Sequence, residues 1–436
     1  MIQYFKQAWT LIRQEKLFSS IYIIGTGLSV TIVMIVSIVF YLKIANIYPE
    51  THRDRMLTVS MATEKSTKGG YNSSAMMSSH VVETCFKSLK SAEAVTAELL
   101  TMVMEEGNFV QPEGSKEQLP VAVRHIDTQF WTVFPFRFVE GKAFTEADFQ
   151  SGIPTVVMAE SLAKRLFGSA TEAIGKQLSI NFRQFRVCGV VKDAPYVTRK
   201  AYAQLWVPYT AHSVFASSQY SFTQSLGFLT VCILAPSASA MEQVYQEATE
   251  NIQRYNQTLT DLEFTVNGQP DRYWQMVFRG LSSGTVDFSG LLFFYGFIFF
   301  ILLMVPAISL SGMTDSRIER RISEMGVRRA FGAPVHRLMG QIISENFLFT
   351  LLGGAVGLLS SYLLILLGRQ WITQLGELVS MPPPEGIEVV FTPSMLLNLP
   401  VLAIALGICF LLNLLSSLMP AWRYSRREII HSLNLK

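Results

Sequence analysis

Four stretches of the chain contain no Asp, Glu, Lys or Arg and are long enough to cross a lipid bilayer. About 20 helical residues are needed to cross the ~30 Å hydrocarbon core. Because backbone N–H and C=O groups find no partners in lipid, each stretch is predicted to be a transmembrane helix. The predicted spans are residues 17–42, 288–314, 346–368 and 395–419.

The composition supports a membrane protein. Half of the 436 residues are hydrophobic and only 16% are charged, whereas soluble domains carry roughly 25% charge. The net charge of +3 is too small to indicate a nucleic-acid partner, and 28 Gly, 17 Pro and 4 Cys exclude collagen-like, disordered and disulfide-rich classes.

Lys and Arg gather in three segments outside the spans, residues 1–16, 315–345 and 420–436, whereas residues 369–394 hold three Glu and one Arg. Basic residues mark cytoplasmic segments, and four crossings place all three basic segments on one side. We therefore predict that both termini are cytoplasmic, that residues 43–287 form a large extracytoplasmic domain and that residues 369–394 form a short outer loop.

The first span is predicted to be an uncleaved anchor. A cleaved signal peptide has a shorter apolar core and an A-x-A-like site, and the uncharged stretch of residues 17–42 lacks both features.

The outer segment has a mixed α/β pattern. Residues 182–191 alternate between apolar and polar positions and then become continuously apolar, which predicts a strand that becomes buried. The number of subdomains stays open. The other predictions are a strand at 155–158, a helix at 160–166 that ends at Gly168, an amphipathic helix at 241–255, and loops at 62–80 and 105–118.

No catalytic, cofactor or metal site is predicted. Cys85, Cys188 and Cys232 are an odd number in the outer segment, and no disulfide is predicted among them. The G-x-S-x-G sequence at 280–284 lies directly before a span and is interpreted as a hinge, because a hydrolase elbow needs a strand before it and a soluble helix after it. The six His lack metal-ligand spacing. Gly175-Lys176 fails the phosphate-loop pattern, because Ala170 stands at the first Gly position and Gln177 replaces the hydroxyl residue, so any ATP hydrolysis is assigned to another chain.

The link at residues 315–345 has a more elaborate pattern than a loop that only anchors the spans by its positive charge would need. It reads as an amphipathic helix, a Gly332-Ala333-Pro334 break and a second helix that leads into the third span. Charge alone would indicate only the cytoplasmic side. The helical pattern favours a docking surface for a cytoplasmic partner.

The link also carries a recognisable sequence. Residues 322–333, ISEMGVRRAFGA, closely resemble the signature of the MacB/FtsX-type permease family, whose members read like R-x-x-E-I-G-[IV]-R-[RK]-A-[LM]-G-A. The resemblance continues in the G-G-x-x-G run at 353–357, in P-A-W-R at 420–423, in I-G-x-G-L at 24–28 and in F-V-E-G-K-x-F at 138–144. It therefore covers nearly the whole chain.

The resemblance implies a fold class and a set of partners. The fold class is an α-helical membrane protein with four transmembrane helices and a large mixed α/β extracytoplasmic domain inserted between helices 1 and 2. Because the chain begins 16 residues before the first span, it resembles the subgroup with a separate ATPase. Two permease chains, identical or different, would pair with a cytoplasmic ATPase dimer that holds the ATP and Mg.

By the same resemblance, residues of the link form the contact that couples the permease to this ATPase. The coupling residues are Ile322, Glu324, Met325, Gly326, Arg328, Arg329 and Gly332. The glycines of the third span, Gly353, Gly354 and Gly357, provide a small-x-x-x-small face for close helix packing. Packing within one chain and packing between two chains both fit that face.

The function implied is a permease subunit that transmits ATP-driven motion to its outer domain in the inner membrane of a bacterium. It would export a peptide, antibiotic, toxin or lipid, with a periplasmic adaptor or carrier and membrane lipid as further partners. The alternatives are a lipoprotein-release permease and a cell-division type transmitter that activates a cell-wall hydrolase. No charge lies at a span centre, which disfavours an ion pathway.

Overall fold

The computed structural model describes residues 16–100, 108–114, 117–212, 224–279, 282–301 and 334–368, with single positions between 304 and 331 and parts of 400–414. The chain divides into two compact units. The larger unit contains Leu42–Phe288 and is called the outer domain here. The other unit, called the helical unit, contains the remaining described helices.

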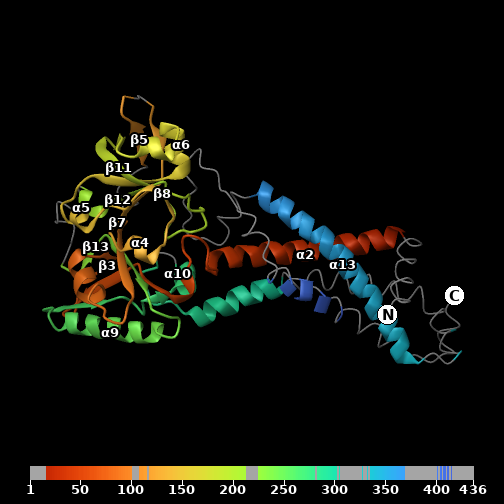
Figure 1. Cartoon of the computed structure of the whole chain (residues 1–436). Helices are drawn as coiled ribbons and strands as arrows, with labels where there is room; N and C mark the ends of the chain where they lie inside the picture. The colour runs from red at the N-terminus through yellow and green to blue at the C-terminus, as the bar shows by residue number, and fades with distance from the viewer. Residues whose placement is uncertain are drawn as a thin grey trace. The chain divides into compact units, whose positions relative to one another are not determined.

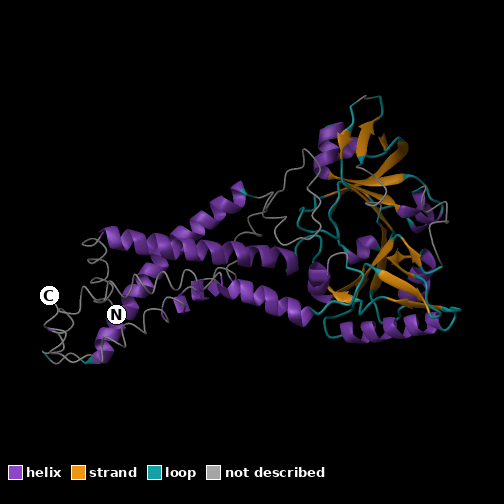
Figure 2. Ribbon diagram, turned by 180° about the vertical axis from the view of Figure 1, so that it is seen from behind, coloured by secondary structure: helices purple, strands orange, loops and turns teal. Residues whose placement is uncertain are grey.

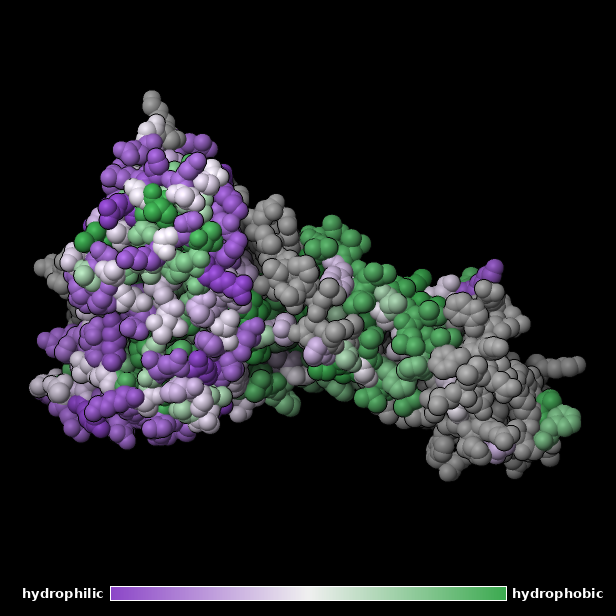
Figure 3. All heavy atoms as spheres, viewed as in Figure 1, coloured by the Kyte–Doolittle hydropathy of each residue, from purple (hydrophilic) through white to green (hydrophobic). Residues whose placement is uncertain are grey.

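Three long apolar helices make up most of the described helical unit (Figure 1). They are α2 (Lys16–Ile44), the helix Phe288–Ile301 and α13 (Val335–Leu367). Two stretches within them, Ser19–Ile44 and Phe347–Leu367, are long and apolar enough to cross a membrane. Hydrophobic side chains cover the visible surface of these helices (Figure 3). The other two predicted spans are described only in part, so four crossings stay a prediction.

Helix α13 is longer than the predicted third span. It runs for 33 residues without a break from its N-cap at Pro334 to Gly368. Proline at the start of a helix costs nothing, because the first N–H groups have no intrahelical partner. The end of the link, residues 335–345, and the third span are therefore one continuous helix.

The outer domain is a mixed α/β structure around a highly connected sheet (Figure 2). The sheet order is β15-β2-β3-β14-β4-β7-β12-β9-β11-β10-β5-β6, with β1 and β13 beside β14 and β3, β16 beside β1, and β8 beside β11. Most pairs are antiparallel, and the pairs β9–β11 and β7–β12 are parallel. The strands are β1 (Met56–Val59), β2 (Ala62–Ser66), β3 (Asn72–Met77), β4 (Ala94–Leu99), β5 (Phe109–Pro112), β6 (Leu119–Pro120), β7 (Val123–Ile126), β8 (Phe138–Gly141), β9 (Thr155–Ala159), β10 (Gln177–Ile180), β11 (Arg183–Val191), β12 (Leu205–Pro208), β13 (Leu226–Gly227), β14 (Leu229–Leu234), β15 (Leu262–Thr265) and β16 (Asp271–Arg272).

The helices of the outer domain are short, apart from α9 (Met241–Asn256), which lies along the part of the domain that holds β3 and β13 (Figure 1). The short ones are η1 (Arg53–Arg55), α3 (Ser79–Val81), η2 (Val82–Phe86), α4 (Phe130–Val133), α5 (Glu146–Gln150), α6 (Glu160–Phe167), α7 (Ala170–Ala173), η3 (Tyr209–Ala211) and α10 (Tyr273–Arg279).

The sheet consists of two halves. Strands β5 to β12 form an inserted half, and the strands before and after them in sequence, β1 to β4 and β13 to β16, form a terminal half. Within the sheet the two halves meet where β4 pairs with β7, at Glu98↔Ile126 and Leu99↔His125. One cluster of buried residues extends across both halves. The outer domain is therefore one domain whose two halves share a single core.

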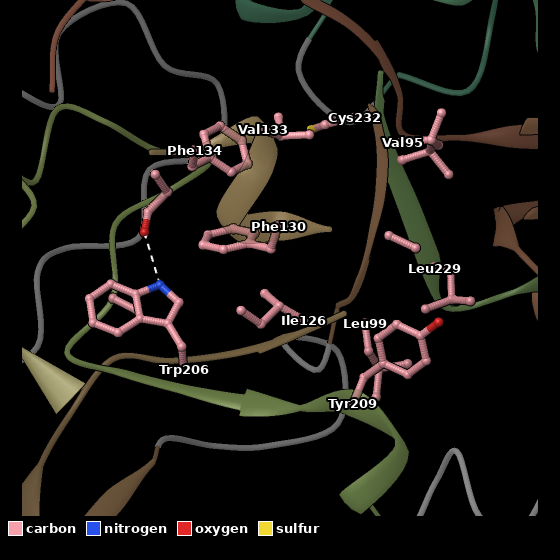
Figure 4. Packing of buried hydrophobic residues seen from close by; sticks show 14 of the residues in the cluster. Val95, Leu99, Ile126, Phe130, Val133, Phe134, Trp206, Tyr209, Leu229 and Cys232 are labelled. Atoms are coloured by element: carbon pink, nitrogen blue, oxygen red, sulfur yellow. Dashed lines mark hydrogen bonds between the residues drawn. The ribbon is translucent and has the colours of Figure 1, made fainter. Parts of the chain in front are cut away.

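The centre of this core is aromatic (Figure 4). Trp206 of β12 is fully buried, and its indole lies near the rings of Phe136 and Trp131 at centroid distances of 4.9 Å and 6.1 Å. Its Nε1 donates a hydrogen bond of 3.1 Å to the carbonyl of Ala201. A large apolar side chain and a satisfied buried donor fix this strand to the preceding loop.

Several sequence predictions for the outer domain are confirmed. Strand β11 has exposed and buried positions in alternation and ends fully buried, the strand at 155–158 is β9, and the helix at 241–255 is α9. Helix α6 ends at Gly168, whose positive φ of 86° is a left-handed conformation that glycine adopts without strain.

The two predicted loops are wrong. Residues 62–80 hold β2 and β3, and residues 105–118 hold β5. Strands β2 and β3 contain Thr, Ser and Lys because much of their surface is outside the core. Cross-strand contacts such as the 2.8 Å hydroxyl pair of Thr63 and Ser74 hold them together. Because residues 62–80 are mostly polar, the hairpin of β2 and β3 was wrongly predicted to be a loop.

Both ends of the sheet path are protected against pairing with another chain. At β15, the carboxamide of Asn256 accepts from the N–H of Phe264 and donates to its C=O, at 2.7 Å and 2.8 Å. At the other end, β6 contains Pro120, which has no N–H to offer. These edges resist the association that open strands invite.

The three described cysteines are free thiols with no reactive character. Burial raises the pKa of Cys85 and Cys188 to about 12 and that of Cys232 to about 11. Because the thiolate is the nucleophile, these groups are inert at neutral pH.

We predict that Trp206→Phe destabilises the outer domain by about 1–3 kcal/mol, because the buried carbonyl of Ala201 loses its donor. Chemical unfolding of the purified full chain, followed by circular dichroism, measures this. Tyr71→Phe, at an exposed tyrosine, is the control and is expected to change stability by less than about 0.5 kcal/mol. Equal effects of the two substitutions would contradict the prediction.

Candidate functional site

The residues assigned to ATPase coupling lie outside the described residues: Ile322, Glu324, Met325, Gly326, Arg328, Arg329 and Gly332. Two positions between them are described. The N–H of Phe331 donates to the carbonyl of Val327 over 3.1 Å, which is a helical spacing, and the Phe331 side chain is 89% exposed. A large apolar group is thus open to contact at this point of the link.

Two of the three predicted packing glycines face α2 of the same chain. A Cβ added at Gly353 would lie 2.6 Å from Cβ of Thr26, and one added at Gly357 would lie 2.5 Å from the carbonyl oxygen of Gly27. Real Cβ atoms do not approach so closely, so only glycine fits at either position. A Cβ added at Gly354 would instead lie 2.6 Å from Cδ2 of Leu406.

The contacts show that α2 and α13 run in the same direction. Tyr22 meets Phe349 at a ring distance of 5.0 Å, Thr26 meets Gly353, and Val30 meets Gly357. Each step advances four residues on both helices, and in Figure 1 the two helices cross. Two parallel membrane helices require the chain to return across the membrane between them. This supports a crossing that begins with the helix Phe288–Ile301.

A polar contact reinforces this pair of helices. The hydroxyl of Thr31 donates to the carbonyls of Gly27 and Gly357, at 2.8 Å and 3.2 Å. Glycine brings the two backbones close enough for a side chain of one helix to reach the carbonyl of the other.

Beyond the helical unit, the last turn of α2 is held by Arg53. The final carbonyls of a helix have no intrahelical partner, and the guanidinium Nη1 donates to the carbonyls of Leu42 and Ala45, at 2.9 Å and 2.8 Å. The positive charge is also favourable at this end of the helix dipole. Arg53 is 3% exposed and lies over the ring of Tyr273, 4.7 Å from its centroid.

Glu50 completes the same cluster as a carboxylate with four donors. It accepts from Nε of Arg53 at 2.7 Å, from the hydroxyl of Tyr273 at 2.6 Å, and from the N–H groups of Lys200 and Ala201 at 2.7 Å and 2.9 Å. Burial is the largest influence and would lower the pKa of Arg53, but Glu50 and Tyr273 together outweigh it and the net shift is upward. Burial and Glu50 both raise the pKa of Tyr273. The guanidinium of Arg53 is therefore charged, and Tyr273 is the neutral donor.

These contacts connect the end of α2 to the core of the inserted half. Ala201 donates its N–H to Glu50 and accepts from Trp206 through its C=O. Nη2 of Arg53 also donates to the carbonyl of Val197 over 3.1 Å. The loop between β11 and β12 is thus bound on one side to the first helix and on the other to the aromatic centre in Figure 4.

A second buried arginine holds the other end of the outer domain. Arg279 pairs with Asp271 through two nitrogens, and Nη1 donates to the carbonyl of Gly284 over 2.7 Å. Burial raises the pKa of Asp271, and Arg279 opposes that shift. Asn267 donates to the carbonyl of Ser283. The carbonyls of Ser283 and Gly284 are thus bonded to the outer domain, and Gly280 and Leu281 of the predicted hinge lie outside the described residues.

The two ends of the domain are neighbours in the sheet. Strand β1, which follows Arg53, pairs with β16, which precedes α10, at Leu57↔Arg272 and Thr58↔Asp271. Sequence reasoning missed Glu50, Arg53, Asp271 and Arg279. Charges close to a membrane span usually lie in water or among headgroups, and only their full burial shows another role.

Comparison with known proteins identifies the family. A MacB-like periplasmic core domain matches residues 19–251, which is more than half of the chain, and the C-terminal part of FtsX-like permeases matches residues 296–429. The chain belongs to the MacB/FtsX family of ABC transporter permeases. The large α/β region of this permease is thus a periplasmic core domain, as the sequence resemblance implied.

Two curated relatives are representative. The uncharacterized ABC transporter permease YknZ of Bacillus subtilis is 23% identical over 289 residues, which is 66% of this chain and 67% of the relative. The pyoverdine export ATP-binding/permease protein PvdT of Pseudomonas savastanoi is 26% identical over 235 residues, which is 53% of this chain and 33% of the relative. The match therefore spans about a third of the pyoverdine relative.

Solved structures of outer domains also resemble this permease. The extracellular domain of YknZ covers 48% of this chain at 18% identity with a TM-score of 0.33. The periplasmic region of MacB from Actinobacillus actinomycetemcomitans covers 47% of this chain at 18% identity with a TM-score of 0.31. The matches cover 99% and 88% of the respective structures.

We predict that Arg53→Met destabilises the outer domain by about 3–5 kcal/mol, because it leaves Glu50 buried without its cation. The double variant Glu50→Gln, Arg53→Met is expected to regain part of this loss. Arg254→Met breaks an exposed pair with Glu250 and should cost at most about 1 kcal/mol. Unfolding of the three full-length variants under one condition tests this, and equal losses for Arg53→Met and Arg254→Met would contradict it.

Proposed function

We propose that this permease is the membrane subunit of an ATP-driven exporter and works by mechanotransmission. A separate cytoplasmic ATPase closes on ATP binding and reopens on hydrolysis, and the permease passes that motion to its outer domain. The permease itself binds no cofactor, and ATP and Mg are held by the ATPase.

The observation that carries this proposal is the cluster of Glu50 and Arg53. A domain that only tethers a substrate could be joined to its helix by a flexible linker. Here the last turn of α2 is bound to a fully buried ion pair, which in turn holds the loop between β11 and β12. A displacement of the helix end would therefore move the inserted half with it.

The proposed topology and assembly follow the charge pattern. Four spans in a bacterial inner membrane place both termini and the link in the cytoplasm. Two permease chains and two ATPase chains form the complex, and the ATPase docks on the link through the coupling residues that contain Glu324, Arg328 and Arg329. The exposed ring of Phe331 adds an apolar contact to this surface.

Export is favoured over the two alternatives by the relatives named for pyoverdine export. We propose a cargo that is already outside the inner membrane, of the peptide, antibiotic, toxin or lipid class, and a periplasmic adaptor or carrier that receives it.

The first test is partner capture. A tagged full-length chain is purified from native membranes in mild detergent, and copurifying proteins are identified by mass spectrometry. We predict that an ATP-binding subunit copurifies with the native chain and is lost from the double variant Glu324→Lys, Arg328→Glu.

The matched control reverses an exposed pair of the same spacing in the outer domain, Glu250→Lys with Arg254→Glu. It should retain the ATPase. If no ATP-binding subunit is captured with the native chain even after gentle crosslinking, the transmitter function is contradicted. If the link variant captures as much as the control, the docking surface is elsewhere.

A further inference from the structure

We propose that α13 drives α2 directly, as one rigid pair of helices fastened by Gly353 and Gly357. This inference rests on the proposed transmitter function and names the route that the motion takes. It assigns the third span, rather than the second, as the element that carries motion from the link to the outer domain.

The route begins at the link. Helix α13 starts right after Pro334, the last residue of the predicted break within the link at 315–345, and continues without a break to Leu367. An unbroken helix moves as a rod over this length, because each turn is hydrogen-bonded to the next. A push at the start of α13 therefore reaches the residues that face α2.

The contact between the two helices has no room for sliding. It is made at three successive turns, by Tyr22 with Phe349, Thr26 with Gly353, and Val30 with Gly357. At the last two turns the glycine lies where a single added carbon would collide. Sliding by one residue in either direction would bring Val356 or Leu358 to the position of Gly357, where only glycine fits.

The route then follows α2 into the outer domain. The helix is continuous from Lys16 to Ile44, and its last carbonyls are bound by Arg53. From there the contacts of Glu50 lead to Ala201 and Trp206. Every step from Pro334 to the core of the inserted half is thus an unbroken helix, a glycine contact or a buried hydrogen bond.

The described part of the second span makes no close glycine contact of this kind with α2. A Cβ added at Gly296 would meet no atom within 4 Å, and Phe293, Phe294 and Phe300 are each more than half exposed. Its ring contact with α2, between Tyr295 and Phe40, has a centroid distance of 6.4 Å. This helix is packed more loosely against α2 than α13 is.

The readout is hydrogen exchange of the complete complex with its copurified ATPase, with and without ATP. The segment to follow is the loop at 192–204, which is bound by Glu50 and Arg53. The native complex is expected to show an ATP-dependent change in exchange there. If it shows none, the proposed transmitter function itself fails, whatever the route.

The decisive variant locks the two helices together. Tyr22→Cys with Phe349→Cys, at two rings whose centroids lie 5.0 Å apart, is made in a chain whose four native cysteines are replaced, and the two thiols are joined by a short reducible crosslinker. Neither substitution adds a Cβ at the glycine contacts. Because we infer that these helices never move against each other, the ATP-dependent change should persist in the crosslinked protein. Its loss on crosslinking and return on reduction would overturn the inference.

A wedge tests the same contact from the other side. Gly353→Leu should separate α13 from α2, so that the ATPase still copurifies and hydrolyses ATP but the change at 192–204 is lost. Gly353→Ala is the milder wedge if the leucine variant does not fold. Gly296→Leu, at a glycine with open space, should behave as the native chain. A native response in both Gly353 variants would show that the motion takes another route.

Discussion

The buried ion pair of Glu50 and Arg53 is the interaction on which the rest of this architecture depends. Two charges removed from water are costly unless every remaining donor and acceptor is satisfied. Here the guanidinium binds the end of a membrane helix and the carboxylate binds the loop of a sheet, so satisfying the charges joins the two. Apolar residues of the same size could fill this space, but they could not fix the direction of the helix end relative to the loop.

The outer domain has a buried arginine near each of its ends. Arg53 and Arg279 bind to different halves of the domain. Arg53 reaches the inserted half through Val197 and Glu50, whereas Arg279 is paired with Asp271 in the terminal half. Strands β1 and β16 keep the two ends adjacent. If the chain segments that contain Arg53 and Arg279 moved relative to each other, the two halves would be pulled in different directions. The strain would fall on the backbone pairing between β4 and β7, where the two halves meet in the sheet.

The sequence predicted those elements and motifs that are encoded within a single continuous segment of the chain. Uncharged stretches located α2 and α13, the alternation at 182–191 located β11, and the motif at 322–333 indicated the family. It did not reveal β2 and β3, because their buried apolar residues, such as Ala62 and Met77, are few and polar side chains occupy most other positions.

The candidate site was harder to predict than the fold. Arg53 and Arg279 are single charges near spans. Their acidic partners are close in sequence, but the cluster around Glu50 also needs Ala201 and Tyr273, which are distant in sequence. The small faces of Gly353 and Gly357 were visible in the sequence, but their partner helix was not. The surfaces that these residues bury are set by tertiary contacts, and no local pattern records them.

The stiffness of the connection between α2 and the outer domain can be measured in the full-length protein. Spin labels are placed at Leu28, which is exposed on α2, and at Glu242, which is exposed on α9, and their distance distribution is measured by pulsed electron resonance in lipid nanodiscs. We expect one narrow distribution for the native chain and a broad one for the double variant Glu50→Gln, Arg53→Met. A broad distribution in the native chain, or an equally narrow one in the variant, would contradict this expectation.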